Sequence, residues 1–108
     1  MSGETTAVRR PRGLCSVEAK MSVAHRAKGG GEVHGHSYQV LAWFDAWQDM
    51  DPLEAQLRAV VAQLDHKTLP DAMTWAEDVA VWIGSQLTNC RVVEVNRPME
   101  GRFCSVTL

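Results

Sequence analysis

Alternation of apolar and polar residues predicts two long strands in the first half of the chain. Between Cys15 and His25 the odd positions are apolar up to the final histidine, whereas most even positions carry Ser, Glu or Lys. A period of two is typical of a strand with one buried face. A second strand is predicted from about His34 to Phe44, where both parities carry bulky residues. This second pattern favours a sheet that is covered on both sides.

Two amphipathic helices follow, each with a start signal. Asp51 is the predicted N-cap of the first helix, with Pro52 at its first position and Glu54 as the capping-box partner. Thr74 is the predicted N-cap of the second helix, and Glu77 is its capping-box partner, a role that explains Glu77 without any function. The apolar stripes are Leu53, Leu57, Val60, Val61 and Leu64 in the first helix and Trp75, Val79, Trp82, Ile83 and Leu87 in the second.

The remaining pattern completes a single α+β domain. Two short strands are predicted at 91–96 and 102–108, joined by a turn around Pro98 and Gly101. The predicted order is therefore strand, strand, helix, helix, strand, strand. Residues 1–13 hold three arginines and no apolar periodicity, which predicts a flexible N-terminal arm before a domain at 14–108. A chain of 108 residues has room for one domain.

Composition and charge exclude several classes of function. Eleven basic and thirteen acidic residues give 11 − 13 = −2, so we expect no binding to nucleic acid or to an anionic membrane. The apolar runs are only a few residues long, against roughly 20 for a membrane-spanning helix. The N-terminal arginines precede no apolar run, so a secretory signal is not predicted and a cytoplasmic location is expected. Three cysteines without a C-x-x-C motif argue against a disulfide framework or a thiolate zinc site.

The histidines form the first candidate site. His34 and His36 are two residues apart, so in a strand their side chains project from the same face. His25 ends the neighbouring predicted strand and can supply a third imidazole. Three nitrogen ligands with one open position are typical of catalytic zinc. The alternative is a His-Gly-His turn with exposed histidines, and spacing alone leaves both interpretations open.

Two acidic positions form further candidates. Asp65 precedes His66, and a neighbouring carboxylate can orient an imidazole for proton transfer. The alternative is a helix C-terminus at which His66 and Lys67 interact with the macrodipole. Glu94 lies within a predicted strand, where a charge requires a partner unless the strand is at an exposed edge.

Five short segments, taken in order, resemble the 6-pyruvoyl-tetrahydropterin synthase family, which includes the 6-carboxy-tetrahydropterin synthases of queuosine biosynthesis. They are Met21–Arg26, His34–Tyr38, Leu64–Leu69, Thr74–Ala80 and Val92–Glu94. Each motif alone is weak, but five in this order, including every histidine, are a specific signal. The resemblance covers about residues 15 to 108.

The resemblance implies a fold, an assembly and a reaction. The expected architecture is the tunnelling fold, an antiparallel sheet with two helices on one face. Three protomers of that fold form a trimeric β-barrel, and two trimers stack into a hexamer with active sites between subunits. The implied activity is that of a zinc-dependent lyase acting on dihydroneopterin triphosphate or a related pterin-like small molecule.

The resemblance also implies a role for each matching residue. It implies zinc ligands at His25, His34 and His36, a proton relay at Asp65 and His66, and substrate-binding residues at Glu94, Glu77 and Thr74. A buried carboxylate suits the role given to Glu94, because it can accept two hydrogen bonds from the guanidine-like edge of a pterin.

The loop before His34 departs from the family pattern. Family members carry a catalytic cysteine there, but this chain has Lys28, Gly29 and Gly30. Glu32 is the only acid–base candidate in the loop and is similar to the glutamate of the family branch that cleaves the side chain differently. We therefore expect altered chemistry and little 6-pyruvoyl-tetrahydropterin. The alternatives are a non-catalytic zinc- and pterin-binding protein and a zinc lyase or cyclase recruited to a non-pterin metabolite.

Overall fold

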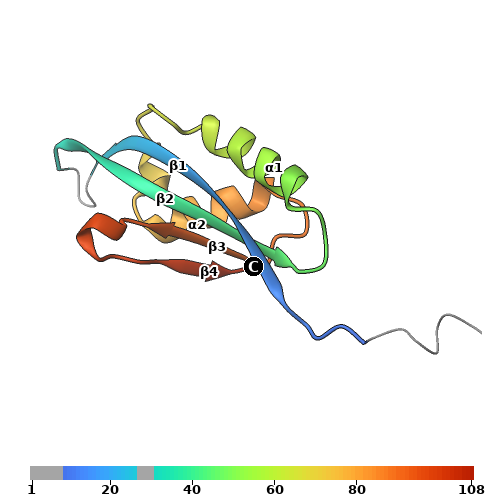
Figure 1. Cartoon of the computed structure of the whole chain (residues 1–108). Helices are drawn as coiled ribbons and strands as arrows, with labels where there is room; N and C mark the ends of the chain where they lie inside the picture. Colours follow the sequence, from blue (N-terminus) through green and yellow to red (C-terminus); the bar gives the residue numbers. More distant parts are fainter. Residues whose placement is uncertain (1–8, 27–30) are drawn as a thin grey trace, which may run out of the picture.

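The chain folds into a four-stranded antiparallel sheet with two helices on one face (Figure 1). The computed structural model describes residues 9–26 and 31–108. The strands are β1 (Leu14–Arg26), β2 (Val33–Asp45), β3 (Val92–Asn96) and β4 (Ser105–Thr107), and they lie in that order in the sheet. The helices are α1 (Met50–Ala62) and α2 (Ala76–Gln86), with 3-10 turns η2 (Asp71–Met73) and η3 (Pro98–Glu100). The predicted fold class and element order are confirmed.

The core lies between the helices and one face of the sheet. Val40, Ala42 and Phe44 of β2 are fully buried there, because alternate residues of a strand point to the same side. Leu57 of α1 and Ile83 of α2 are fully buried against them. Helix α1 packs mainly on β1 and helix α2 mainly on β3, so both helices hold the sheet from the same side.

The second face of the sheet carries no helix in the described part of the chain, although the bulky residues of β2 led us to expect cover there. Leu41, Trp43 and Glu94 on this face are partly buried, and the register of β2 with β3 sets Leu41 opposite Glu94. Asn96 is the buried polar residue here, with 1% exposure. Its carboxamide binds Gln39, Glu94 and the Cys104 backbone N–H.

Both predicted helix starts are wrong by one or two residues. Helix α1 is capped by Asp49, whose carboxylate accepts a hydrogen bond from the backbone N–H of Asp51 at 3.0 Å. At the start of α2, the carboxylate of Asp78 accepts from the backbone N–H of Trp75 at 2.9 Å. Glu77 is therefore not the capping partner. In both places a second acidic residue nearby matches the capping pattern, and only the backbone path decides between the two.

The predicted N-terminal arm lies partly outside the described residues, since residues 1–8 are not described. Gly13 accepts a backbone hydrogen bond from Ala46 at 2.9 Å, and the carbonyl of Pro11 accepts one from the Trp47 indole at 2.9 Å. The guanidinium of Arg10 lies 5.0 Å from the Trp47 ring centroid. These contacts hold residues 10–13 against the turn that follows β2. The flexibility of the arm stays a prediction.

Candidate metal centre

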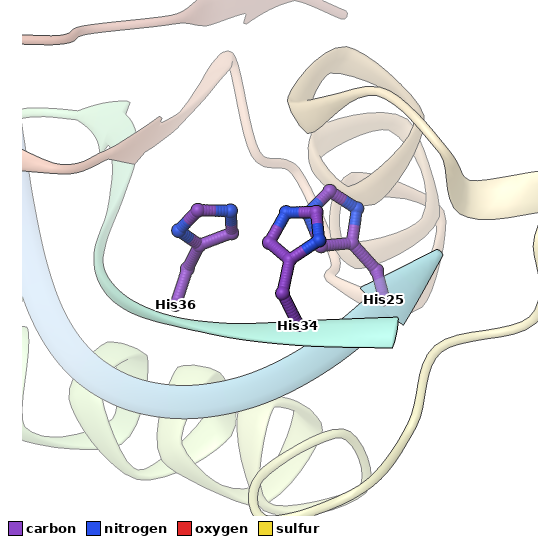
Figure 2. Close-up of side chains that lie close together, drawn as sticks. All are labelled: His25, His34 and His36. Carbon is purple, nitrogen blue, oxygen red and sulfur yellow. The ribbon is translucent and has the colours of Figure 1, made fainter. Parts of the chain in front are cut away.

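Three histidines meet at the end of the β1–β2 hairpin where the connecting loop joins the two strands (Figure 2). The register sets His25 directly opposite His34 and Val23 opposite His36, so all three side chains project from one face. The ring centroids are 4.5 to 5.0 Å apart. One nitrogen of each ring lies within 4.8 Å of a nitrogen of the other two. The three histidines are therefore close enough to bind one metal ion.

The surroundings of the His25 ring leave one of its nitrogens available as a ligand. It forms a hydrogen bond with the backbone of Thr74, while its Nε2 atom is buried and has no hydrogen-bond partner among the described residues. A buried polar atom without a partner is costly unless a ligand completes it. Metal-binding histidines commonly use one ring nitrogen for the metal and the other for a backbone group or carboxylate. The environment of His25 fits that pattern.

The surroundings of His25 and His36 favour the neutral form of both rings. Burial lowers the pKa of His25, and the positive charges of His34 and Arg97 lower it further. Burial also lowers the pKa of His36, with Arg97 as the next cause. A neutral imidazole has the free lone pair that a metal requires. A set of three imidazole nitrogen donors fits zinc.

An arginine that the sequence analysis did not single out borders the histidines. Arg97 follows β3, and its Nη1 atom lies 2.9 Å from Nδ1 of His36 and 3.3 Å from Nε2 of the same ring. Its side chain is only 19% exposed, and Glu100 lies 3.4 Å away. The sequence carried a signal for this position, because Arg97 continues the alternation of the buried residues Val93 and Val95 and is therefore expected on the same face of the sheet.

Asp65 and His66 form the pair that the sequence predicted, but at the edge of β1. Oδ1 of Asp65 lies 2.9 Å from Nδ1 of His66 and accepts the backbone N–H of Ser22 at 2.8 Å. The N–H of His66 donates to the carbonyl of Ser22 at 2.7 Å, and its backbone has a φ of +61°. The His66 side chain is 79% exposed. His66 and His36 line the same open depression, and no hydrogen bond joins them in the described structure.

Glu94 lies on the opposite face of the sheet from the three histidines. It pairs with Leu41 in the register, whereas His36 has the parity of the buried residue Val40. Its carboxylate accepts hydrogen bonds from the Trp43 indole and from the Asn96 amide at 3.2 Å. A carboxylate can accept about four hydrogen bonds, so acceptor sites remain. The exposed-edge interpretation is wrong, because β3 lies between β2 and β4.

The remaining predicted site residues, Glu32, Thr74 and Glu77, contact different parts of the chain. The side chain of Glu32 is exposed, while its backbone carbonyl lies 3.3 Å from Nδ1 of His34. The Thr74 hydroxyl donates to the carbonyl of Asp71 at 2.7 Å. Glu77 is exposed and binds the Cys104 thiol. Residues 28–30, where the family cysteine is absent, lie outside the described residues.

Comparison with solved structures identifies the fold. No family model matches the chain, and no curated protein matches it. The structure of the 6-pyruvoyl tetrahydropterin synthase of Caenorhabditis elegans superposes with a TM-score of 0.75, covering 94% of this chain and 99% of that one at 16% identity. The chain has the 6-pyruvoyl tetrahydropterin synthase fold. The enzyme of Plasmodium falciparum matches with a TM-score of 0.67, covering 92% of this chain and 100% of that one at 15% identity.

The 6-pyruvoyl tetrahydropterin synthase fold confirms at the level of architecture the resemblance carried by the five sequence motifs. The superposition spans nearly all of this chain and nearly all of both matching chains. At 15–16% sequence identity, these matches identify the fold. They do not identify the metal, the substrate or the reaction.

Proposed function

We propose that this chain is a zinc-dependent, pterin-synthase-like lyase that acts on dihydroneopterin triphosphate or a related compound. The observation that carries the proposal is the convergence of His25, His34 and His36 within 4.8 Å. The fold supports it, because the two matching structures are 6-pyruvoyl tetrahydropterin synthases. The functional assembly in this proposal is a hexamer with active sites between subunits.

The residues of the metal centre would divide the work between binding and proton transfer. His25, His34 and His36 would hold zinc, which acts as a Lewis acid that stabilises negative charge on coordinated oxygen atoms. Asp65 would orient His66, whose exposed ring can accept and release a proton. Since active sites of this proposed assembly lie between subunits, His66 of one chain would serve the histidines of another.

Glu32 is the proposed base in place of the missing cysteine. Its backbone lies next to His34, and its carboxylate is exposed, so the side chain is free to turn toward the metal centre. A carboxylate is a weaker base than a thiolate. We therefore propose a side-chain cleavage or another lyase outcome, with little 6-pyruvoyl-tetrahydropterin formed.

Glu94 lies on the opposite face of the sheet from the histidines of its own chain, so it is the proposed anchor for the amino group and ring N–H of a pterin bound at the metal centre of a neighbouring subunit. The substitution Glu94→Gln keeps the size of the side chain and removes its charge. We expect it to weaken binding of a 2-amino-4-oxopteridine by about 2–5 kcal/mol if both carboxylate oxygens are engaged. Titration calorimetry measures this loss, and zinc content should stay unchanged. Equal affinity of the wild type and the variant would remove the pterin from the proposal.

One incubation tests the proposed function as a whole. Zinc-loaded protein is mixed with dihydroneopterin triphosphate, and the products are identified by mass spectrometry. We expect release of the triphosphate or cleavage of the side chain, and loss of this product in Glu32→Gln. Binding without turnover would support the non-catalytic alternative. Abundant 6-pyruvoyl-tetrahydropterin that persists in Glu32→Gln would show that another group is the base.

A further inference from the structure

Arg97 is a nearly enclosed cation beside the three histidines. Its backbone is fixed by hydrogen bonds in both directions across the β3–β4 turn, with Arg97 N–H to the Arg102 carbonyl at 2.8 Å and the reverse bond at 3.2 Å. Gly101 closes this turn with a φ of +68°, a conformation that disfavours other residues. The side chain of Arg97 is 19% exposed. The fold therefore sets this guanidinium at the metal centre.

Arg97 lies over the face of the His36 ring, because its Nη1 atom is 2.9 Å from Nδ1 and also 3.3 Å from Nε2. A donor aligned with the in-plane lone pair of one ring nitrogen would lie much farther from the other nitrogen, so the lone pair of His36 stays available to a metal. A neutral imidazole has one such lone pair, and its other nitrogen carries a proton. Once a metal takes the lone pair, the ring has only an N–H left to offer. His36 therefore offers Arg97 no acceptor when a metal is bound, and the N–H groups of Arg97 require another partner.

The N–H groups of Arg97 have few acceptors nearby. Among the described residues, Glu100 is the carboxylate paired with Arg97, at 3.4 Å from Nη1, and its side chain is 51% exposed. The three histidines contribute no negative charge. A divalent metal, Arg97 and Glu100 together carry a net charge of +2 − 1 + 1 = +2 at a partly buried position. Such a site is completed best by a group that brings negative charge and oxygen acceptors.

We propose that Arg97 binds an anionic oxygen group of the substrate, a phosphate or a carboxylate, beside the metal held by His25, His34 and His36. This inference rests on the zinc site of the proposed function and adds a substrate class and a specificity residue to it. Guanidinium groups suit this role because their planar donors match oxyanions.

The test measures anion binding and metal binding without following any reaction. Zinc-loaded wild-type protein is titrated calorimetrically with inorganic phosphate, and in a second arm with acetate. Arg97→Gln should weaken binding of the preferred anion at least tenfold, while the zinc content stays at about one ion per chain. Arg102→Gln is the matched control, because this exposed arginine lies in the same turn, and it should bind the anion as the wild type does. The arm that shows the Arg97-dependent binding identifies the phosphate or the carboxylate as the source.

The variant Arg97→Lys and the zinc-free protein separate the effect of charge on anion binding from an effect on folding. Arg97→Lys keeps the cation and should retain more anion binding than Arg97→Gln. Zinc-free wild-type protein should bind the anion more weakly than the zinc-loaded form, since the positive charge of the metal is then absent. Equal affinities in the wild type and Arg97→Gln, no anion binding by the wild type, or loss of zinc in Arg97→Gln would each overturn the proposal. Absence of turnover with intact Arg97-dependent binding would instead count against the proposed enzymatic function alone.

Discussion

At the scale of single residues, the sequence analysis predicted the three histidines that come together but did not single out the neighbouring Arg97. The period-two pattern sets His34 and His36 on one face, and a hairpin brings the end of β1, with His25, next to them. Which partner touches each ring nitrogen depends on backbone groups such as that of Thr74, which no side-chain pattern reports. Arg97 was missed because it lies one residue beyond the end of β3, although it continues the alternation of the buried residues Val93 and Val95.

The three histidines should each be required for zinc. We expect purified, zinc-supplemented protein to hold about one zinc ion per chain and His25→Ala, His34→Ala and His36→Ala to lose it, because two remaining imidazoles make a much weaker site. Elemental analysis after dialysis measures the metal. His66→Ala, which removes a mostly exposed ring outside this group, should keep its zinc. Wild-type protein that takes up no zinc would contradict the metal centre.

Cys104 should make the protein sensitive to alkaline pH. Burial and the neighbouring Glu77 raise the pKa of its thiol from 9.0 to about 11. The unfolded chain loses this proton near pH 9, whereas the folded chain keeps it until about pH 11, so the free energy of unfolding should fall between these values. Burial also raises the pKa of Tyr38 and Cys90, which adds in the same direction.

Urea denaturation across pH 8 to 11 isolates the thiol when the wild type is compared with Cys104→Ala. The fall in stability should be shallower in the variant, because one group with a raised pKa has been removed. Parallel curves for the two proteins would show that Cys104 ionises at the same pH in both states.

At the scale of elements, the alternation and the apolar stripes predicted each strand and helix, but not where the helices begin. Several acidic residues lie near each start, and each can accept a hydrogen bond from a first-turn N–H group. The choice falls to Asp49 in α1 and Asp78 in α2 because the preceding turns direct the backbone there. The segment after α1 is a second example, since Leu69 and His66 donate to β1 backbone carbonyls without any strand pattern.

The corrected start of α1 can be tested by stability. Asp49→Ala should lower the free energy of unfolding by about 1 kcal/mol, since it removes the acceptor for the Asp51 N–H. Asp51→Ala should cost less, about 0.5 kcal/mol, through the loss of a favourable charge in the first helical turn. Chemical denaturation of both variants gives the comparison. A larger loss for Asp51→Ala would restore Asp51 as the cap.

At the scale of the whole molecule, the described part of one chain leaves one face of the sheet without helices and both edge strands without a further strand beside them. Its helix-free face carries Leu41, Trp43 and Glu94, and its edge strands are β1 and β4. Edge strands with free backbone groups are commonly paired or covered. None of the helices in the described part of the chain is long and apolar enough to span a bilayer. Other copies of the chain are the proposed cover, and sequence periodicity carries no information on how many.

The proposed hexamer predicts a mass six times the 12.0 kDa of one chain. Light scattering at micromolar concentration measures it, and closure of the sheet edges through neighbouring subunits is the physical reason. Replacing Trp43 by Glu would add a charge to the helix-free face and should lower the mass. A monomeric mass for the wild type would contradict both the barrel and an active site shared between subunits.

The division of the metal centre between one hairpin and a distant turn also orders events during synthesis. All three histidines belong to β1 and β2, while Arg97 lies 61 residues beyond His36. On the ribosome, a chain made from the N-terminus exposes all three proposed zinc ligands well before the last strands exist. Metal can therefore join the nascent hairpin at a stage when the positive charge of Arg97 is not yet present beside His36. The order of translation thus favours loading of the centre before the sheet is complete.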